Sequence, residues 1–205
     1  MKTIEESMLK RVRGRGRGSA VTPADFLDLG KRAAVDQGLS RLTRKKMLMR
    51  VSRGLYALPE INEWIGEVSP APDEVAKALA RRGSSKLLPS GALAANLLGL
   101  SDQVPAKAEY LTDGPSCRVM IKRLTVVLKQ TTPKNLATAG RVSGVVIQAL
   151  RFLRRQQVGS EVVAKLRERL QPAERRQLVK DIPLAPAWMA PVFREIAGEG
   201  SGTGE

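Results

Sequence analysis

Residues 22–58, TPADFLDLGKRAAVDQGLSRLTRKKMLMRVSRGLYAL, are the stretch of sequence that decides the fold. The stretch opens with Thr22 as a helix N-cap, Pro23 at the first helical position and the carboxylate of Asp25 three residues after the cap. This order is typical of a helix start, because it suits the first-turn N–H groups that have no partner inside the helix. A short helix is therefore predicted to follow, and Gly30 is placed to end it.

The next helix is predicted to start near Lys31. Val35, Leu39 and Leu42 recur at helical spacing and form its apolar face. The residues left for solvent or a ligand are Lys31, Arg32, Asp36, Gln37, Ser40, Arg41 and Arg44. A helix with one apolar and one basic face fits the major groove of DNA, where arginine reads guanine and glutamine reads adenine.

Two short strand-like runs, 47–51 and 55–58, follow this helix and are separated by a turn that contains glycine. The pattern predicts a β-hairpin. On the N-terminal side of the stretch, apolar residues at helical spacing predict a further helix over 4–13, which Gly14 and the glycines after it end. Three helices followed by a hairpin form the plan of a winged helix-turn-helix domain, which we expect over residues 1–60.

This plan predicts which residues contact DNA. Arg32 and Gln37, near the start of the third helix, are expected to read bases. The arginines of the hairpin and of the glycine-rich loop over 14–18 are better placed for phosphates or the minor groove. The complete set of predicted DNA-binding residues is Arg15, Arg17, Lys31, Arg32, Gln37, Ser40, Arg41, Arg44, Arg50 and Arg53. A winged helix can also bind proteins, so an adaptor for an acidic protein partner is the alternative.

The charge of the chain also favours a polyanionic partner. The 205 residues include 35 Lys and Arg against 20 Asp and Glu, a net charge of +15. Residues 1–60 alone have a net charge of +8, which is more than half of the excess. Such a distribution is expected of a nucleic-acid-binding module joined to a more neutral body.

The chain has no histidine, which excludes Ser–His–Asp and Cys–His catalytic pairs and histidine-containing zinc sites. Cys117 is the single cysteine, so no intramolecular disulfide forms and a reducing compartment, the cytoplasm, is expected. No window approaches the roughly 18 consecutive apolar residues of a membrane-spanning helix, and residues 1–17 lack the apolar segment of a secretory signal. We therefore expect a cytoplasmic protein with no membrane partner, no metal and no cofactor.

The remainder of the chain predicts a second domain over residues 69–197, which begins with a helix over 73–82. The runs with the character of strands are Tyr110–Thr112, Arg118–Ile121 and Leu124–Gln130. From Ala137 onward the pattern predicts helices. The apolar residues of the first run from Val142 to Leu153 and this helix ends in Arg154–Arg155; Val162–Leu170, Pro172–Ile182 and Ala187–Ala197 predict three more. The expected fold class is α+β and mostly helical, with the winged helix followed by an α/β domain that has a small sheet and a C-terminal helical bundle. Residues 198–205 are predicted to be a disordered tail.

Catalytic signals are scarce in this second domain. Asp102, Glu109 and Asp113 are its clustered carboxylates, and we interpret them as turn and surface acids because no spacing places two of them on one face. A nucleic-acid-processing enzyme built on these carboxylates is a third hypothesis; we predict instead that the protein is not an enzyme and has no catalytic residue. A second basic surface comprises Arg154, Arg155, Arg167, Arg169, Arg175 and Arg176. It is either a set of solvated helix faces or an extension of the contact with a nucleic acid or an acidic protein.

Several segments together carry a family resemblance. In the first domain they are Thr22–Gly30, Ala33–Leu42 and Arg53–Tyr56, and in the second Val75–Arg82, Pro89–Ala92, Ala95–Leu100, Leu111–Ser116 and Thr131–Asn135. In order and number they resemble the antitoxins of the AbiEi type, the first partners of bicistronic type IV toxin–antitoxin systems. The resemblance extends from about Thr3 to Ala197.

The resemblance implies a winged-helix domain that represses its own operon by binding inverted repeats in the double-stranded DNA of its promoter. It also implies a larger C-terminal region that counteracts a nucleotidyltransferase-like toxin, in that family without a stable one-to-one complex. Three residues depart from the family's pattern. Lys46 stands where a glycine often ends the recognition helix, Met49 stands where a basic wing residue is common, and Gly38 lies inside a helix, where alanine is favoured by about 1 kcal/mol.

Overall fold

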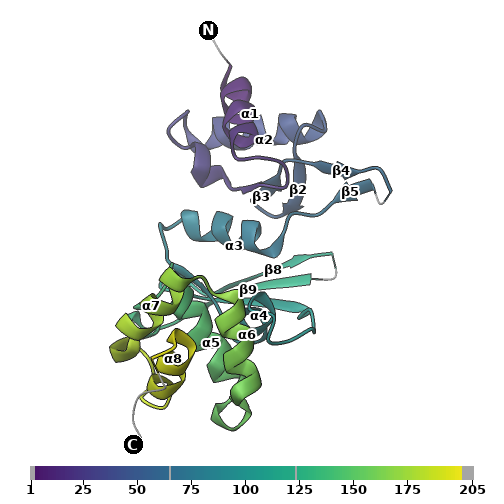
Figure 1. Cartoon of the computed structure of the whole chain (residues 1–205). Coiled ribbons are helices and arrows are strands. Elements are labelled where there is room, and N and C mark those ends of the chain that lie inside the picture. Colours follow the sequence, from purple (N-terminus) through teal and green to yellow (C-terminus); the bar gives the residue numbers. More distant parts are fainter. Residues whose placement is uncertain (1–2, 65, 123, 200–205) are drawn as a thin grey trace, which may run out of the picture. The chain divides into compact units, whose positions relative to one another are not determined.

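The computed structural model describes residues 3–64, 66–122 and 124–199, and it has an α+β fold (Figure 1). The chain divides into two compact units. The first comprises residues 1–85 and 117–127, and the second comprises residues 86–116 and 128–205. The sequence-based division assigns DNA binding to residues 1–60 and antitoxin activity to residues 69–197, and it stays a prediction.

Helices and short antiparallel strands alternate along both units. The first unit consists, in chain order, of α1 (Ile4–Gly14), β1 (Ala20–Val21), the 3₁₀ helix η1 (Pro23–Phe26), α2 (Arg32–Arg44), β2 (Met49–Ser52), β3 (Leu55–Ala57), β4 (Glu60–Asn62), β5 (Gly66–Val68), α3 (Pro72–Arg81) and β8 (Cys117–Ile121). The second unit consists of β6 (Leu87–Pro89), α4 (Gly91–Leu97), β7 (Lys107–Thr112), η2 (Pro133–Leu136), α5 (Val142–Leu153), η3 (Arg155–Gln157), α6 (Ser160–Arg169), α7 (Pro172–Lys180), η4 (Ile182–Leu184) and α8 (Met189–Ala197). Strand β9 (Leu124–Gln130) contributes residues to both units.

The core of the first unit lies where α1 and α2 pack against each other. Met8 of α1 is buried with Val35 and Leu39 of α2 and with Phe26 of η1. Gly38 allows the two helices to approach closely, because a Cβ atom at this position would lie 3.0 Å from the sulfur of Met8. Gly38 is unfavourable for helix propensity, but its lack of a side chain is required by the close packing of α1 against α2.

The start of α2 at Arg32 confirms the predicted third helix. The predicted cap of the preceding short helix is confirmed as well, because the Thr22 N–H donates to the Asp25 carboxylate at 2.7 Å. The element that follows this cap is a 3₁₀ helix that ends at Phe26, rather than a helix that continues to Gly30. The reason is a turn, in which the Leu29 N–H donates to the carbonyl of Phe26.

Strands β1, β3 and β2 form a three-stranded antiparallel sheet in the order β1-β3-β2. The predicted hairpin is therefore confirmed, and Arg50 of β2 lies opposite Tyr56 of β3. Strand β2 begins at Met49, two residues later than predicted. Residues 47 and 48 instead donate their N–H groups to the carbonyl of Leu42, which closes the end of α2.

A second hairpin, which the sequence pattern does not predict, follows in residues 60–68. Strands β4 and β5 pair only with each other, and Ile61 lies opposite Glu67. A turn joins them before Gly66, whose φ of +72° lies in the left-handed region that glycine adopts without strain. Figure 1 shows the pair as an arm that projects from the rest of the first unit.

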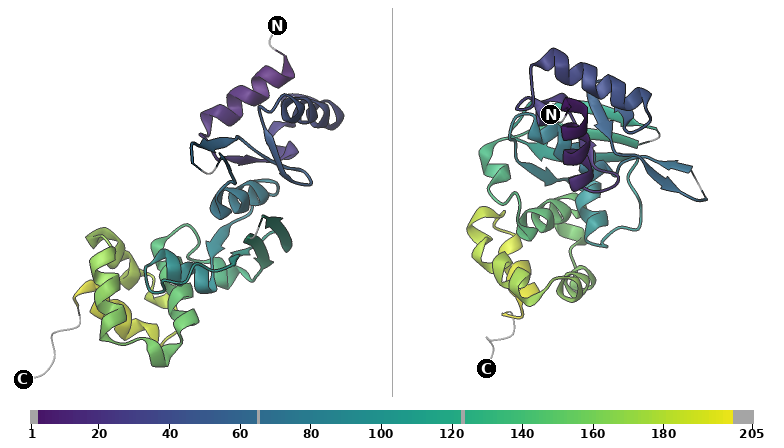
Figure 2. Two further views of the ribbon diagram at one scale, coloured as in Figure 1. Left: turned by 90° about the vertical axis from the view of Figure 1, so that its right-hand side faces the viewer. Right: turned by 90° about the horizontal axis from the view of Figure 1, so that it is seen from above.

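The second unit combines strands β6 and β7 and the end of β9 with a helical bundle. These strands belong to a sheet of the order β6-β7-β9-β8, and the predicted bounds of β8 and β9 differ from the observed ones by at most one residue. Helix α5 ends at Leu153, before the predicted end at Arg154–Arg155, because Arg154 has a φ of +64° outside the helical region; α6, α7 and α8 lie around it (Figures 1 and 2). Leu150, Leu166, Leu178 and Phe193, one from each of these helices, are fully buried in one core.

The last helices differ from the predicted bounds at their ends. Helix α7 stops at Lys180, because the chain turns into η4, and α8 starts at Met189. Gly198 and Glu199 cap α8 rather than belong to a disordered tail: Gly198 has a φ of +83° and the Glu199 N–H donates to the carbonyl of Arg194. The rest of the predicted tail, residues 200–205, lies outside the described residues.

Candidate nucleic-acid interface

The exposed face of α2 is the first part of the candidate interface. Ala33, Gln37, Ser40 and Arg44 follow one another at helical spacing on the side opposite the buried residues of this helix, and all four are exposed. The side chains along the centre of this face are short or carry amide and hydroxyl groups, and Arg44 provides the positive charge at its C-terminal end. Such a face can approach a nucleic-acid groove closely and form hydrogen bonds there.

Two adjoining grooves connect this face with the hairpin β2–β3. The first, of about 330 Å³, is lined by Ser40, Thr43, Arg44, Arg50 and Tyr56. The second, of about 530 Å³, shares two of these residues and is lined by Thr43, Lys46, Leu48, Met49, Arg50, Pro59, Ile61 and Glu67. The grooves therefore join Arg44 of the helix to Arg50 of the strand, with a phenol ring beside them.

The predicted DNA-binding residues fall into three groups. Five cations have no ion-pair partner among the described residues: Arg17, Lys31, Arg44, Arg50 and Arg53. Three arginines are already paired: Arg15 with Asp25 at 2.9 Å, Arg32 with Asp36 at 2.9 Å and Arg41 with Glu5 at 3.1 Å. The other two, Gln37 and Ser40, are uncharged and exposed. A paired arginine must share or lose its carboxylate before it binds a phosphate, so the unpaired group is the better source of phosphate contacts.

Glu5 fixes one side of α2 to the start of α1. Its carboxylate accepts hydrogen bonds from Lys45 at 3.0 Å and from Arg41 at 3.1 Å. The hydrogen bond from Lys45, followed by the one from Arg41, holds the pKa of Glu5 below its usual value. Two cations at the C-terminal end of α2 are thereby used inside the protein, and Arg44 between them remains free of such a pair among the described residues.

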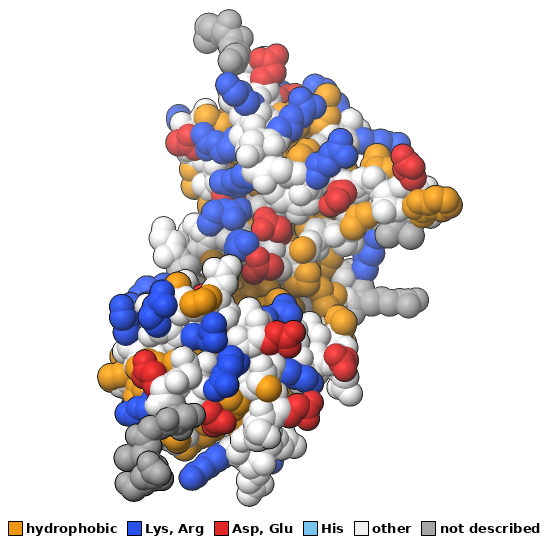
Figure 3. Space-filling model, in the orientation of Figure 1, with side chains coloured by type: hydrophobic (Ala, Val, Ile, Leu, Met, Phe, Trp, Pro, Cys, Tyr) orange, Lys and Arg blue, Asp and Glu red, His pale blue; other side chains and the backbone are white. Residues whose placement is uncertain are grey.

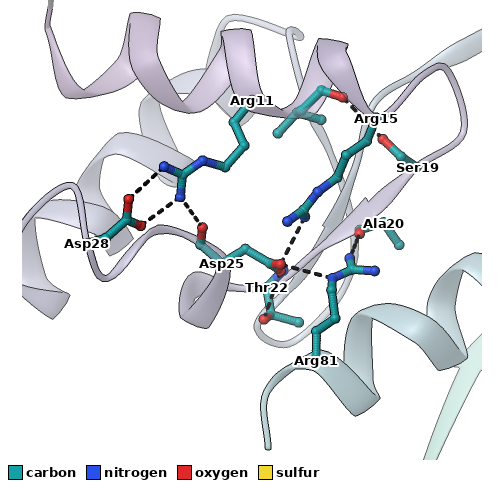
Figure 4. A network of polar contacts seen from close by, with 9 residues as sticks. Arg11, Arg15, Ser19, Ala20, Thr22, Asp25, Asp28 and Arg81 are labelled. Carbon is teal, nitrogen blue, oxygen red and sulfur yellow. Dashed lines mark hydrogen bonds and ion pairs between the residues drawn. The ribbon is translucent and has the colours of Figure 1, made fainter. Parts of the chain in front are cut away.

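Asp25 is the centre of a buried polar network that positions η1, β1 and α3 (Figure 4). Its side chain is 4% exposed, and it pairs with Arg15 at 2.9 Å and with Arg81 at 3.0 Å. Arg81 also donates to the carbonyl of Ala20 in β1 at 2.6 Å. Burial raises the pKa of Asp25, but the hydrogen bonds from the Thr22 N–H and from Arg81, together with the positive charges of Arg81 and Arg15, outweigh it and leave this pKa below its ordinary value.

A neighbouring pair completes the network in Figure 4. The guanidinium of Arg11 donates to both carboxylate oxygens of Asp28 and to the carbonyl of Asp25, each at 2.6 Å. It also lies 5.8 Å from the centre of the Phe26 ring. The hydrogen bond from Arg11 lowers the pKa of Asp28. These contacts fix η1 against α1, and so define where the chain enters α2.

Lys46 is the clearest residue that the set of predicted contacts lacks. It has a φ of +57°, in the left-handed region, and it lines the larger groove. A lysine in this conformation costs about 1 kcal/mol more than a glycine would. Its position at the end of the predicted helix, where a glycine is expected, is the sequence signal that could have identified it, because it places a cation where the backbone favours glycine.

Thr43 and Tyr56 also belong to the grooves and are absent from the sequence-based set. Tyr56 lies opposite Arg50 in the hairpin, so the predicted strand register would have placed its ring beside that arginine. Thr43 donates its hydroxyl to the carbonyl of Leu39 at 2.8 Å and contributes to the groove wall. No pattern in the sequence distinguishes it from an ordinary helical threonine.

The second basic surface is spread over three helices of the second unit. Arg154, Arg155, Arg167, Arg169 and Arg176 are exposed, while Arg175 is partly buried and its Nε has no hydrogen-bond partner among the described atoms. Arg167 donates to the carbonyl of Glu195, and Arg169 lines a depression of about 440 Å³ beside Gly99. Lys165 and Glu168 line the same depression as Arg169, so cations and an acid are interleaved there; on the face that Figure 3 shows, blue and red side chains are likewise mixed in the lower part of the molecule.

Two of the three central carboxylates lie in a turn and in a strand. Asp113 accepts the backbone N–H of Lys86 at 2.8 Å, as a turn residue does, and Glu109 lies within β7. In the described part of the chain, no group of three or more acidic or sulfur ligands is arranged to hold a metal ion. Within the same residues, no helix has both the length and the apolar character that a membrane crossing requires.

Comparison with known proteins places the chain in a family. Its fold is similar to that in the crystal structure of the RV2827C protein from Mycobacterium tuberculosis, with 17% identity and a TM-score of 0.43, over 98% of this chain and 78% of that chain. No curated protein matches the chain. Residues 6–178 match the model of a family of unknown function, DUF6088. The protein therefore belongs to the DUF6088 family.

Proposed function

We propose that this protein is a DNA-binding autorepressor and antitoxin whose first unit is a winged helix-turn-helix. The element order α1-β1-η1-α2-β2-β3 with the sheet order β1-β3-β2 supports this proposal, because it is the order in which a winged helix builds its recognition helix and wing. Helix α2 takes the role of the recognition helix, and the hairpin β2–β3 takes the role of the wing.

The observation that carries the proposal is the pair of unpaired arginines across the groove between α2 and the hairpin. Arg44 and Arg50 line one groove, and neither has an ion-pair partner among the described residues. A phosphate bound there gains two charge-assisted partners without breaking an internal ion pair. Gln37 and Ser40 on the same helix face then lie toward the base edges and supply sequence preference.

The first prediction concerns the double substitution Arg44→Ala and Arg50→Ala in the full chain. We expect its affinity for DNA from upstream of its own gene to fall by about two orders of magnitude, because each arginine is worth on the order of 1–3 kcal/mol. The slope of log K against log salt should become shallower by about two, since two fewer counterions are released. Fluorescence anisotropy titrations at several salt concentrations measure both quantities.

The matched control is Arg82→Ala, which removes one exposed cation from the first unit away from these grooves. We expect this variant to bind within about threefold of the natural protein, as general charge effects alone are small. A natural protein that binds no upstream DNA at low salt would contradict the repressor proposal. Equal losses in Arg82→Ala and in the double variant would remove these grooves as the interface.

The antitoxin half of the proposal rests on the resemblance to AbiEi-type antitoxins and assigns toxin neutralisation to the second unit. It predicts a nucleotidyltransferase-like reading frame beside this gene. Expression of that frame alone should stop growth, and co-expression of this protein should restore it. Restoration should persist in the Arg44→Ala, Arg50→Ala variant, because repression and neutralisation then use different surfaces. A neighbouring frame that is harmless when expressed alone would contradict this half.

The alternative is an adaptor in which the first unit binds an acidic protein instead of DNA. The same basic grooves would then hold carboxylates, and the salt dependence of binding would resemble that of DNA. A competition experiment tests whether the two ligands share one site, because a DNA duplex from the promoter region displaces an acidic protein only if both bind in the grooves. The uncharged, exposed helix face of Gln37 and Ser40 favours DNA, since base edges offer hydrogen-bonding partners there.

A further inference from the structure

The hairpin β4–β5 carries the most exposed large apolar side chains of the first unit. Trp64 at its turn is 91% exposed and Ile61 on β4 is 74% exposed. Figure 3 shows the apolar side chains at the tip of this arm beside an acidic one. Isolated exposed apolar residues are common, but an indole and an isoleucine together on a projecting two-stranded arm indicate an interaction surface.

The charge of this arm is opposite to that of the rest of the chain. Residues 60–68 contain three glutamates and no lysine or arginine, in a chain whose net charge is +15. Glu63 and Glu67 are exposed and have no ion-pair partner among the described residues. This charge disfavours a polyanion as the partner of the exposed tip of the arm, although Ile61 and Glu67 also line the larger groove.

The neighbouring strand β8 presents the complementary charge. Arg118 and Met120 lie two residues apart on one face of the edge strand β8, and Lys122 follows directly after the strand; all three are exposed, Met120 by 68%. The Lys122 ammonium donates to the backbone carbonyl of Glu67 at 3.1 Å, which ties β8 to the arm within the first unit. The arm and the end of β8 therefore adjoin, with acidic side chains on the arm, cations on and just after β8, and exposed apolar side chains on both.

We propose that this surface binds a second copy of the same chain through a two-fold interface. In such an interface a patch contacts itself, so a patch with adjoining acidic and basic parts is complementary to its own rotated copy. The arm of one protomer lies along β8 of its partner, with Trp64 covered and the glutamates near Arg118. The proposal does not depend on DNA binding, but a two-fold dimer would match an inverted repeat.

Sedimentation equilibrium of the full chain at several concentrations tests the interface. We expect the natural protein to form dimers and Trp64→Glu to be monomeric over the same range, with the dimer dissociation constant raised at least about tenfold. The matched control is Val104→Glu, which places the same charge at an 82% exposed apolar residue of the second unit and should leave dimerisation unchanged. A natural protein that stays monomeric at every concentration overturns the proposal, as does a dimer that Trp64→Glu leaves intact.

Charge exchange provides a second and sharper test. Glu63→Arg and Arg118→Glu each place like charges against each other in a homodimer, and we expect each variant alone to be monomeric. Mixed in equal amounts, the two should form a heterodimer, because the arm of one variant then meets β8 of the other with opposite charges. Monomers in the mixture would overturn the proposed pairing of the arm with β8.

The outcome of these tests is separate from that of the DNA-binding test. A monomeric Trp64→Glu that still binds a single half-site of the promoter supports both proposals. A dimer that binds no DNA supports the interface and removes the repressor. An unchanged circular dichroism spectrum and a cooperative thermal transition of Trp64→Glu are expected, since its side chain is exposed, and they show that the monomer is folded; its melting temperature is expected to be lower only at concentrations at which the natural protein is a dimer.

Discussion

Replacement of Gly144 by alanine is expected to destabilise the second unit by about 3 kcal/mol. Gly144 lies in the first turn of α5, and a Cβ atom there would lie 2.5 Å from the carbonyl oxygen of Thr138 and 2.8 Å from a methyl group of Leu88. The carbonyl cannot turn aside freely, because it accepts the N–H of Arg141 in the turn that starts the helix. Overpacking of this kind costs roughly 1–3 kcal/mol, and the upper end applies because a backbone atom is the obstacle.

Chemical denaturation of the full chain measures the effect, and a glycine with free space provides the control. Gly14 ends α1, and a Cβ atom added to it would meet no other part of the protein within 4 Å. Gly14→Ala should change stability by less than about 1 kcal/mol, in the favourable direction of helix propensity. A Gly144→Ala protein as stable as Gly14→Ala would show that the start of α5 yields easily, contrary to its close packing against Thr138 and Leu88.

The second large effect is expected for Asp25→Ala, which should destabilise the first unit by about 2–3 kcal/mol. The substitution leaves the Thr22 N–H without its acceptor and removes the shared partner of Arg15 and Arg81. Removal of one partner from a buried pair costs roughly 3–5 kcal/mol, and the value is lower here because the two arginine side chains are about one third exposed. Thermal melting of the full chain measures the loss.

Asp36→Ala is the matched control for this substitution. Asp36 also pairs with an arginine, at 2.9 Å, but both side chains of that pair are about half exposed or more. Exposed pairs four residues apart on a helix contribute roughly 0.3–0.5 kcal/mol, so this variant should be close to the natural protein. If the two variants lost equal stability, Asp25 would be an ordinary surface acid and not the centre of a buried network.

Asp25 also contributes to the pH dependence of stability, with a definite sign. Its pKa in the folded protein lies below its ordinary value, so the unfolded chain binds the proton more tightly. The stabilisation is therefore complete above the unfolded pKa of about 4 and is lost as the pH falls through the lower folded pKa. Asp25→Ala should show a flatter loss of stability below pH 4 than the natural protein does.

The sequence predicts best those elements that have a buried and an exposed face. The apolar residues from Val142 to Leu153 all lie in helix α5, because they recur along one side of it, and β9 has its predicted bounds. The hairpin β4–β5 escapes prediction for the same reason. Glu60, Ile61 and Asn62 of β4 are all exposed, so the strand has no alternation of apolar and polar residues to recognise.

The polar network of the first unit lies beyond any local pattern. The capping role of Asp25 could be predicted, because Thr22 and Pro23 stand three and two residues before it. Its ion pair with Arg81 joins residues 56 positions apart, and nothing in the sequence indicates that pairing. The same limit applies to the candidate interface: the ten predicted contacts follow from exposure on a helix and a hairpin, whereas the division into paired and unpaired cations depends on tertiary neighbours such as Glu5.

The first unit is built from two separate stretches of the chain, because β8 returns to it after the second unit has begun. On the ribosome, the strand that completes this unit emerges only after residue 121, long after α2 and the hairpin β2–β3 have been made. A nascent chain that has reached only Ser85 therefore lacks the cations Arg118 and Lys122. The timing orders the two proposed activities: grooves for DNA can form early in synthesis, whereas pairing with another copy must wait until more than half of the protein has been translated.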